Sequence, residues 1–210
     1  MSINVCNDRS MASITSLPSG VSGSSLVLIS EQTASSSSTI SFTSGIDSTY
    51  KEYIFKFIDI HPQTDITRFS FNMSADGGSN YNVTKTTTAS RAYHSESGSE
   101  NSLSYFDDQD LAQATSDKFL TYYSGNQNDA CNAGTLHLFD PSNTTFVKHF
   151  ICVINENSRE GGSSDPLIQK MFTAGYANTT SAINAVQFKM NSGNMNYLSP
   201  CNLIFHPLKI

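Results

Sequence analysis

The sequence predicts an all-β fold, an antiparallel β-sandwich of the jelly-roll type that carries an extended N-terminal arm. Several segments alternate apolar and polar residues with period two, and Gly, Ser, Asn and Asp fill the gaps between them. No long helical pattern competes with this alternation. A chain of 210 residues is also long enough to bury a substantial core.

The first candidate strands lie at Leu26–Ile29 and Thr39–Phe42, on either side of a serine-rich loop at residues 34–38. The next segment, Lys51–Ile60, is apolar on both of its faces. Such a pattern is typical of a central strand that is covered on both sides.

A β-hairpin is predicted from Thr67–Met73 and Tyr81–Thr88. In the first strand Phe69, Phe71 and Met73 point to one side. Asp76-Gly77-Gly78 follows, and these residues supply the positive φ angles that a tight turn needs.

The remaining candidate strands are Thr135–Phe139, Thr145–Ile154, Met171–Tyr176, Ile183–Met190 and Leu203–Ile210. Pro207 lacks a backbone donor, so the last strand is expected at an edge or at a bulge. Short helical turns are expected after Asp165-Pro166 and within Asp107–Lys118. The candidate core phenylalanines are Phe55, Phe57, Phe69, Phe71, Phe146, Phe150 and Phe188.

The chain is expected to divide into an arm, residues 1–24, and a β-sandwich domain, residues 25–210. The arm is rich in Ser and Gly, and such a composition cannot bury enough apolar surface to fold alone. Its isolated apolar residues could dock on another chain; they are Ile3, Val5, Ile14 and Leu17. Exchange of an arm closes readily around a rotation axis, which favours a symmetric homo-oligomer, most simply a homotrimer.

Composition excludes several classes of partner. Charged residues make up 14% of the chain, the net charge is −6, and no cluster of Lys and Arg occurs, which argues against nucleic-acid binding. The most apolar run, Tyr53–Ile60, is far shorter than the ~20 residues of a spanning helix, so no membrane insertion is expected. The N-terminus has no secretory signal pattern. The four cysteines are expected to be free thiols, with a disulfide such as Cys131 to Cys201 as the alternative.

No motif for catalysis or metal binding stands out. A G-x-S-x-G elbow is missing, the five histidines are scattered singly, and Asp107, Asp108 and Asp110 lack the spacing of a calcium loop. The sequence therefore predicts no enzyme, no cofactor and no metal site.

The best candidate for binding is an aromatic and amide-rich loop. Tyr122 and Tyr123 offer rings that could stack on a sugar, and Asn126 and Asn128 offer amides that could hydrogen-bond to it. The chain contains no Trp, which weakens a lectin interpretation.

Several stretches occur in the same order as in one group of viral proteins. They are Ser41–Tyr50, Tyr53-Ile54-Phe55, Ile60-His61-Pro62, Ser74–Tyr81, Arg91–His94, Gly134–Phe139, Ala174-Gly175-Tyr176, Asn178–Ile183 and Gln187–Met190. In these residues the chain resembles a family of small virion structural proteins of marine tailed bacteriophages, over roughly residues 26–195. The resemblance implies a component of the virus particle, made in the host cytoplasm, and it carries no catalytic residues with it.

Three functional hypotheses follow. The leading one is a non-enzymatic decoration or cement protein on the phage head, because the arm suits attachment to a lattice and the chain is too short for a fibre shaft. The alternative is a tail-fibre or tail-tip module for host attachment, in which the Tyr122 loop contacts a surface glycan. The remote alternative is a secreted polysaccharide-acting enzyme, for which no acid/base pair stands out.

Overall fold

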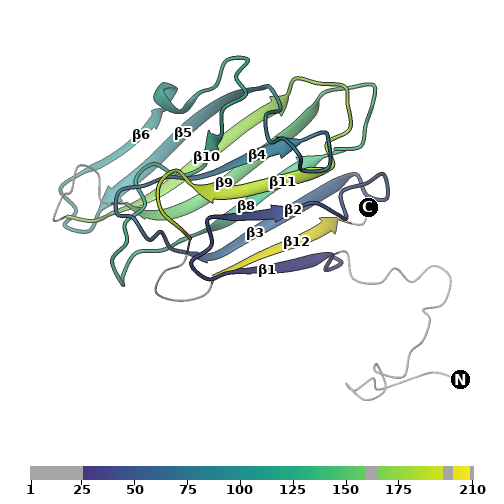
Figure 1. The fold of residues 1–210 in the computed structure, drawn as a ribbon. Coiled ribbons are helices and arrows are strands. Elements are labelled where there is room, and N and C mark those ends of the chain that lie inside the picture. The colour runs from purple at the N-terminus through teal and green to yellow at the C-terminus, as the bar shows by residue number, and fades with distance from the viewer. Residues whose placement is uncertain (1–25, 159–164, 196–200, 209–210) are drawn as a thin grey trace, which may run out of the picture.

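The computed structural model describes residues 26–158, 165–195 and 201–208. The arm, with Ile3, Val5, Ile14 and Leu17, lies outside the described residues. Two antiparallel sheets pack face to face, which confirms the predicted all-β sandwich (Figure 1).

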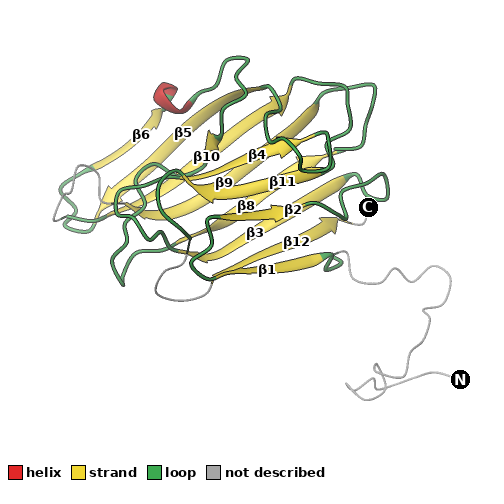
Figure 2. Ribbon diagram, viewed as in Figure 1, coloured by secondary structure: helices red, strands yellow, loops and turns green. Residues whose placement is uncertain are grey.

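One sheet has eight strands and the other has four. Figure 2 colours the strands yellow. In spatial order the larger sheet contains β1 (Ser30–Ala34), β12 (Cys201–Leu208), β3 (Glu52–Ile60), β8 (Asn132–Phe139), β9 (Lys148–Ser158), β10 (Leu167–Ala177), β5 (Lys85–Ser95) and β6 (Asn101–Tyr105). The smaller sheet contains β2 (Thr39–Phe42), β11 (Ala185–Met190), β4 (Phe69–Ser74) and β7 (Lys118–Phe119). A single turn of 3-10 helix, η1 (Asp107–Gln109), follows β6.

The strand order is that of a jelly roll with two insertions. Strands β1, β12, β3 and β8 lie over β2, β11, β4 and β7, and the chain changes sheet at every connection except β5–β6, β8–β9 and β9–β10. This arrangement of eight strands is typical of jelly rolls. The antiparallel pairs β5–β6 and β9–β10 are inserted between jelly-roll strands and widen the larger sheet by four strands.

An aromatic core fills the space between the sheets. The Phe188 ring on β11 lies 5.4 Å from the Phe55 ring and 5.1 Å from the Phe57 ring, measured between centroids. The other confirmed core predictions, Phe69, Phe71 and Phe150, are also buried. The prediction that Phe146 belongs to the core is wrong, because this residue is 69% exposed. It lies in the loop between β8 and β9, where a turn rather than a strand sets the direction of its side chain.

The predicted hairpin is wrong, although its turn exists. Gly77 and Gly78 have φ values of 73° and 88°, and Asp76 Oδ1 accepts a hydrogen bond from the Asn80 backbone N–H at 2.9 Å. The two strands that flank this turn, β4 and β5, belong to different sheets. Turn residues favour a reversal of the chain, but they do not determine which sheet the next strand joins.

The two helical predictions also differ from the structure. Asp165-Pro166 leads directly into β10, and only Asp107–Gln109 is helical within Asp107–Lys118. Beyond η1 the backbone bonds to β5 instead of to itself. The Thr87 N–H donates to the Leu111 carbonyl oxygen, and the Leu111 N–H donates to Thr87 Oγ1. Tertiary partners therefore replace the local helical bonds.

The structure differs from the predictions at both ends of the described chain. Leu26–Ile29 is not a strand, since β1 begins at Ser30. β12 is an interior strand between β1 and β3, so the predicted edge position is wrong. Pro207 is tolerated there because β1 pairs with β12 only as far as Phe205, which leaves one side of Pro207 without a strand.

Cys131 and Cys152 are free thiols, as expected, so the alternative disulfide from Cys131 to Cys201 is not formed. Cys6 lies outside the described residues.

Candidate functional site

The segment between β6 and β8 crosses the inner face of the widened part of the larger sheet. Its Phe106 N–H donates to Ala89 O of β5 at 2.9 Å, and its Tyr122 N–H donates to the Glu156 carboxylate of β9. Residues that the sequence separates widely are thereby brought together around Tyr122.

An arginine–aromatic cluster, defined as Arg68, Arg91, Phe106, Tyr122 and Tyr123, surrounds this point. The Tyr122 ring lies 4.0 Å from the Tyr123 ring and 4.7 Å from the Phe106 ring, between centroids. The guanidinium carbon of Arg91 lies 4.9 Å from the Tyr122 ring, and that of Arg68 lies 5.5 Å from it. Both distances are within the range of cation–π attraction, so two positive charges are held against one ring.

A buried carboxyl group anchors the cluster from the sheet below. Glu156 has no exposed surface, and its two oxygens accept the Tyr122 N–H at 3.0 Å and 2.8 Å. The side-chain amide of Gln169, opposite it on β10, donates to the same carboxyl group. Burial raises the pKa of Glu156 to about 7, although these hydrogen bonds favour the ionised form. Glu156 therefore positions Tyr122 and changes charge near neutral pH.

Arg68 and Arg91 connect the cluster to its surroundings by hydrogen bonds. Arg68 Nε donates to the carbonyl oxygen of Tyr122 at 3.1 Å, and Arg91 Nη1 donates to Gln169 Oε1 at 3.3 Å. The arrangement combines cationic groups, aromatic rings and one titratable carboxyl group. Such a set can hold a loop in one conformation, and it can attract an anionic group.

The four predicted glycan-contact residues meet different surroundings. Tyr122 and Tyr123 lie together, and both are partly buried within the cluster. The Asn126 side-chain amide donates to Gln63 O at 3.1 Å and is thus tied to the loop between β3 and β4. Asn128 is exposed. Glycan contact stays a prediction, with Tyr123 and Asn128 less committed to internal packing than Tyr122.

Sequence analysis missed Arg68, Arg91 and Glu156. Glu156 shares the inward-facing alternation of β9 with Phe150 and Ile154, so period two alone could have placed it inside. By the same alternation along β5, Arg91 lies on the side of the strand that carries the buried Ala89, two residues before it. No sequence signal places Arg68 against Tyr122.

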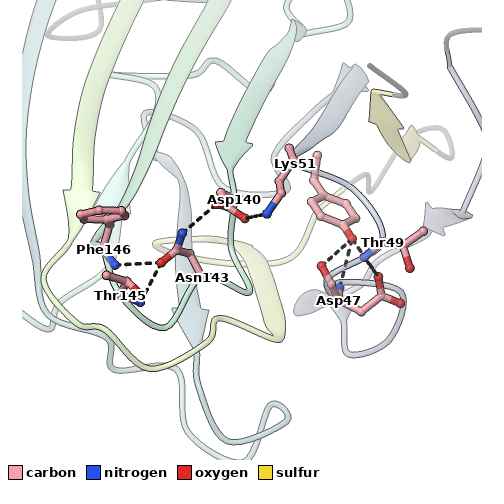
Figure 3. A network of polar contacts seen from close by, with 8 residues as sticks. Asp47, Thr49, Lys51, Asp140, Asn143, Thr145 and Phe146 are labelled. Atoms are coloured by element: carbon pink, nitrogen blue, oxygen red, sulfur yellow. Dashed lines mark hydrogen bonds and ion pairs between the residues drawn. The ribbon is translucent and has the colours of Figure 1, made fainter.

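A second polar network joins the residue before β3 to the loop after β8 (Figure 3). Lys51 Nζ pairs with Asp140 Oδ1 at 2.9 Å, and the Asn143 side-chain amide donates to Asp140 Oδ2 at 2.8 Å. These two contacts, that with Asn143 first, lower the pKa of Asp140. Asn143 Oδ1 accepts the backbone N–H groups of Thr145 and Phe146 at 2.7 Å and 2.8 Å. The network fixes a loop that presents the exposed Phe146 ring.

Within residues 26–158, 165–195 and 201–208, no three His, Cys, Asp or Glu side chains gather as metal ligands. In the same part of the chain, no helix is long and apolar enough to span a membrane. Comparisons with protein-family models, curated proteins and solved structures find no match.

Proposed function

We propose that this chain is a non-enzymatic structural protein on the surface of a tailed-phage particle, and that it decorates the head. The proposal rests on the resemblance of residues 26–195 to phage virion proteins and on the jelly-roll-like order of strands. Jelly rolls serve in viral capsids, but they also serve in lectins and enzymes. The fold alone therefore does not decide the function.

The observation that carries the proposal is a set of exposed apolar side chains on the outer face of the widened larger sheet. Large apolar side chains on β6, β9 and β10 face away from the smaller sheet, with Leu103 80% exposed and Tyr105 64% exposed. The other exposed members are Ile151, Ile168 and Phe172. Exposed apolar residues that gather on one face are typical of contact with other proteins.

The shape of this face suits a protein partner as well. Ala174 has a small side chain, and a shallow apolar groove of about 470 Å³ forms around it between Thr88, Ile151 and Tyr176. β6 is a terminal strand of the sheet, and its outer backbone groups can pair with another chain. We propose that this face contacts the capsid lattice or another copy of the chain.

The arm is the second part of the proposal. Ile3, Val5, Ile14 and Leu17 would bury against a neighbouring subunit and close a symmetric homotrimer. The partners are then other copies of the chain and other virion proteins.

Deletion of residues 1–20 tests this arrangement. The truncated protein should keep a cooperative melting transition, because the confirmed core lies in the described strands, and it should lose attachment to the particle. Light scattering should report a trimer for the full chain and a smaller species for the truncation. A full-length monomer at micromolar concentration, or a truncated protein that still attaches, would contradict the proposal.

Host attachment at the tail is the second candidate function. The observations that favour it are the exposed Phe146 on its fixed loop and the exposed Asn128 beside the cluster. Binding to host surface polysaccharide should fall in Tyr123→Ala and Asn128→Ala, while Leu103→Ser, on the outer face, serves as the matched control. A small number of copies per particle would favour this function, and a large number would favour head decoration.

A further inference from the structure

A buried lysine and a buried asparagine meet between the two sheets. Lys85, the first residue of β5, has no exposed surface, and Asn72 on β4 is 2% exposed. Lys85 Nζ donates to Asn72 Oδ1 at 2.7 Å and to the Val83 carbonyl oxygen at 2.8 Å. Both of these acceptors are neutral, and a buried ammonium group with neutral partners is costly. Burial of this kind makes the charged amine less favourable than it is in water.

The amine lies within reach of the amide carbon. Because a C=O bond is about 1.23 Å long, the Asn72 Cγ atom is at most about 3.9 Å from Lys85 Nζ. Reacting atoms in near-attack arrangements lie about 3–3.5 Å apart, so a small rotation of either side chain suffices.

Each polar atom of the Asn72 amide has a partner that suits acyl transfer. Oδ1 accepts the Met73 backbone N–H at 2.9 Å, which can stabilise negative charge on this oxygen. Nδ2 donates to Asp117 Oδ1 at 3.0 Å and to the Thr115 carbonyl oxygen at 3.0 Å. The other oxygen of Asp117 pairs with Lys189 Nζ of β11 at 2.7 Å, which holds the carboxylate in place.

Burial lowers the pKa of Lys85 to about 8, and the charge of Asp117 opposes this shift. A substantial fraction of the side chain is then the neutral amine near pH 8, and only the neutral amine is a nucleophile.

We propose that Lys85 and Asn72 join in an intramolecular isopeptide bond, with Asp117 as the catalytic base. The Nζ lone pair attacks Cγ, and the carbonyl electron pair moves to Oδ1, where the Met73 N–H stabilises it. Both nitrogens are then bonded to Cγ, so Asp117 beside Nδ2 takes a proton from Nζ and passes it to Nδ2. The Cγ–Nδ2 bond breaks, ammonia leaves, and a secondary amide remains. The step changes no oxidation state and needs no co-reactant.

The bond would link the two sheets covalently. β4 belongs to the smaller sheet and β5 to the larger one, and the link closes a loop between positions 13 apart in sequence. The inference concerns the fold's own chemistry and does not depend on the proposed phage function.

Mass spectrometry of the purified full-length protein tests the proposal. The denatured protein should be lighter than its sequence by the mass of one ammonia molecule. Trypsin should not cleave after an acylated Lys85, so residues 69–91 should appear as one peptide. Fragment ions from cleavage between Asn72 and Lys85 should be missing from its spectrum. A folded protein of full mass, with normal cleavage after Lys85, would overturn the proposal.

Two variants separate the isopeptide from other losses of ammonia. Lys85→Arg should have its full calculated mass, whereas cyclisation of Asn72 onto its own backbone would persist in this variant and would overturn the proposal. Asp117→Ala keeps both reacting groups, and bond formation in it should be slower by about 10²-fold or more. If Lys85→Arg does not fold, the peptide map of the wild-type protein decides alone.

Discussion

The interior of this protein has two halves that are built on different physical principles. Under the smaller sheet, Phe188 packs against rings from both sheets, and the contacts are apolar. Under the segment that follows β6, buried polar groups, with Glu156 and Gln169 at the centre, lie beside a small apolar cluster of Ala89, Phe106 and Met171. β9 contributes to both halves, since its inward side chains change from Phe150 and Ile154 to Glu156.

The difference shows where each half gets its specificity. An apolar core tolerates small shifts, because hydrophobic attraction has no direction. A buried polar layer is stable only when its donors and acceptors find partners, so it fixes one arrangement of the covering segment. The covering segment carries the candidate site, and we expect the apolar half to provide most of the stability.

Phe188→Ala should have the largest effect on stability. The substitution removes a ring that contacts Phe55, Phe57 and Phe69, and it leaves a cavity between the sheets. We expect the free energy of unfolding to fall by about 3–5 kcal/mol in urea titrations. A loss below 1 kcal/mol would show that the apolar half is not the main source of stability.

The pH dependence of stability tests the polar half. Glu156 has a pKa of about 7 in the folded protein and 4.5 as its ordinary value, so the folded state binds the proton more tightly. Its contribution is present below pH 4.5 and is lost as the pH rises to about 7, by about 3 kcal/mol in total. Thermal melts across this range should show a weaker pH slope for Glu156→Gln than for the wild type. Equal slopes would show that Glu156 does not titrate in this window.

Tyr122→Leu should have a smaller effect, with Tyr123→Leu as its matched control. Tyr122 faces both Arg68 and Arg91, whereas the cation–π contact described for Tyr123 is with Arg68. Each cation–π contact contributes about 0.5–1 kcal/mol at partly exposed sites, so Tyr122→Leu should cost more in urea unfolding. The reverse order would contradict the placement of Tyr122 at the centre of the cluster.

Phe146→Ser should have the smallest effect. Its ring is 69% exposed, and the hydrogen bond to Asn143 comes from its backbone, which the substitution leaves in place. The free energy of unfolding should stay within about 0.5 kcal/mol of the wild-type value. A larger loss would place Phe146 in a core, as its sequence pattern first indicated.

The sequence by itself determined the fold class, most of the core and the main turn. Alternation with period two places Phe69, Phe71 and Phe188 inside, and Asp76-Gly77-Gly78 marks a reversal of the chain. These features depend on neighbouring residues, so local patterns report them directly.

Only the tertiary structure decided which strands pair and which polar groups meet. The same turn that predicted a hairpin joins β4 and β5 across the two sheets, and that crossing brings Lys85 to Asn72. Tyr122 and Glu156 meet in the same way, although 34 positions separate them. Contacts of this kind depend on the packing of the whole chain, because a buried polar group is stable only beside a partner that the local sequence does not specify.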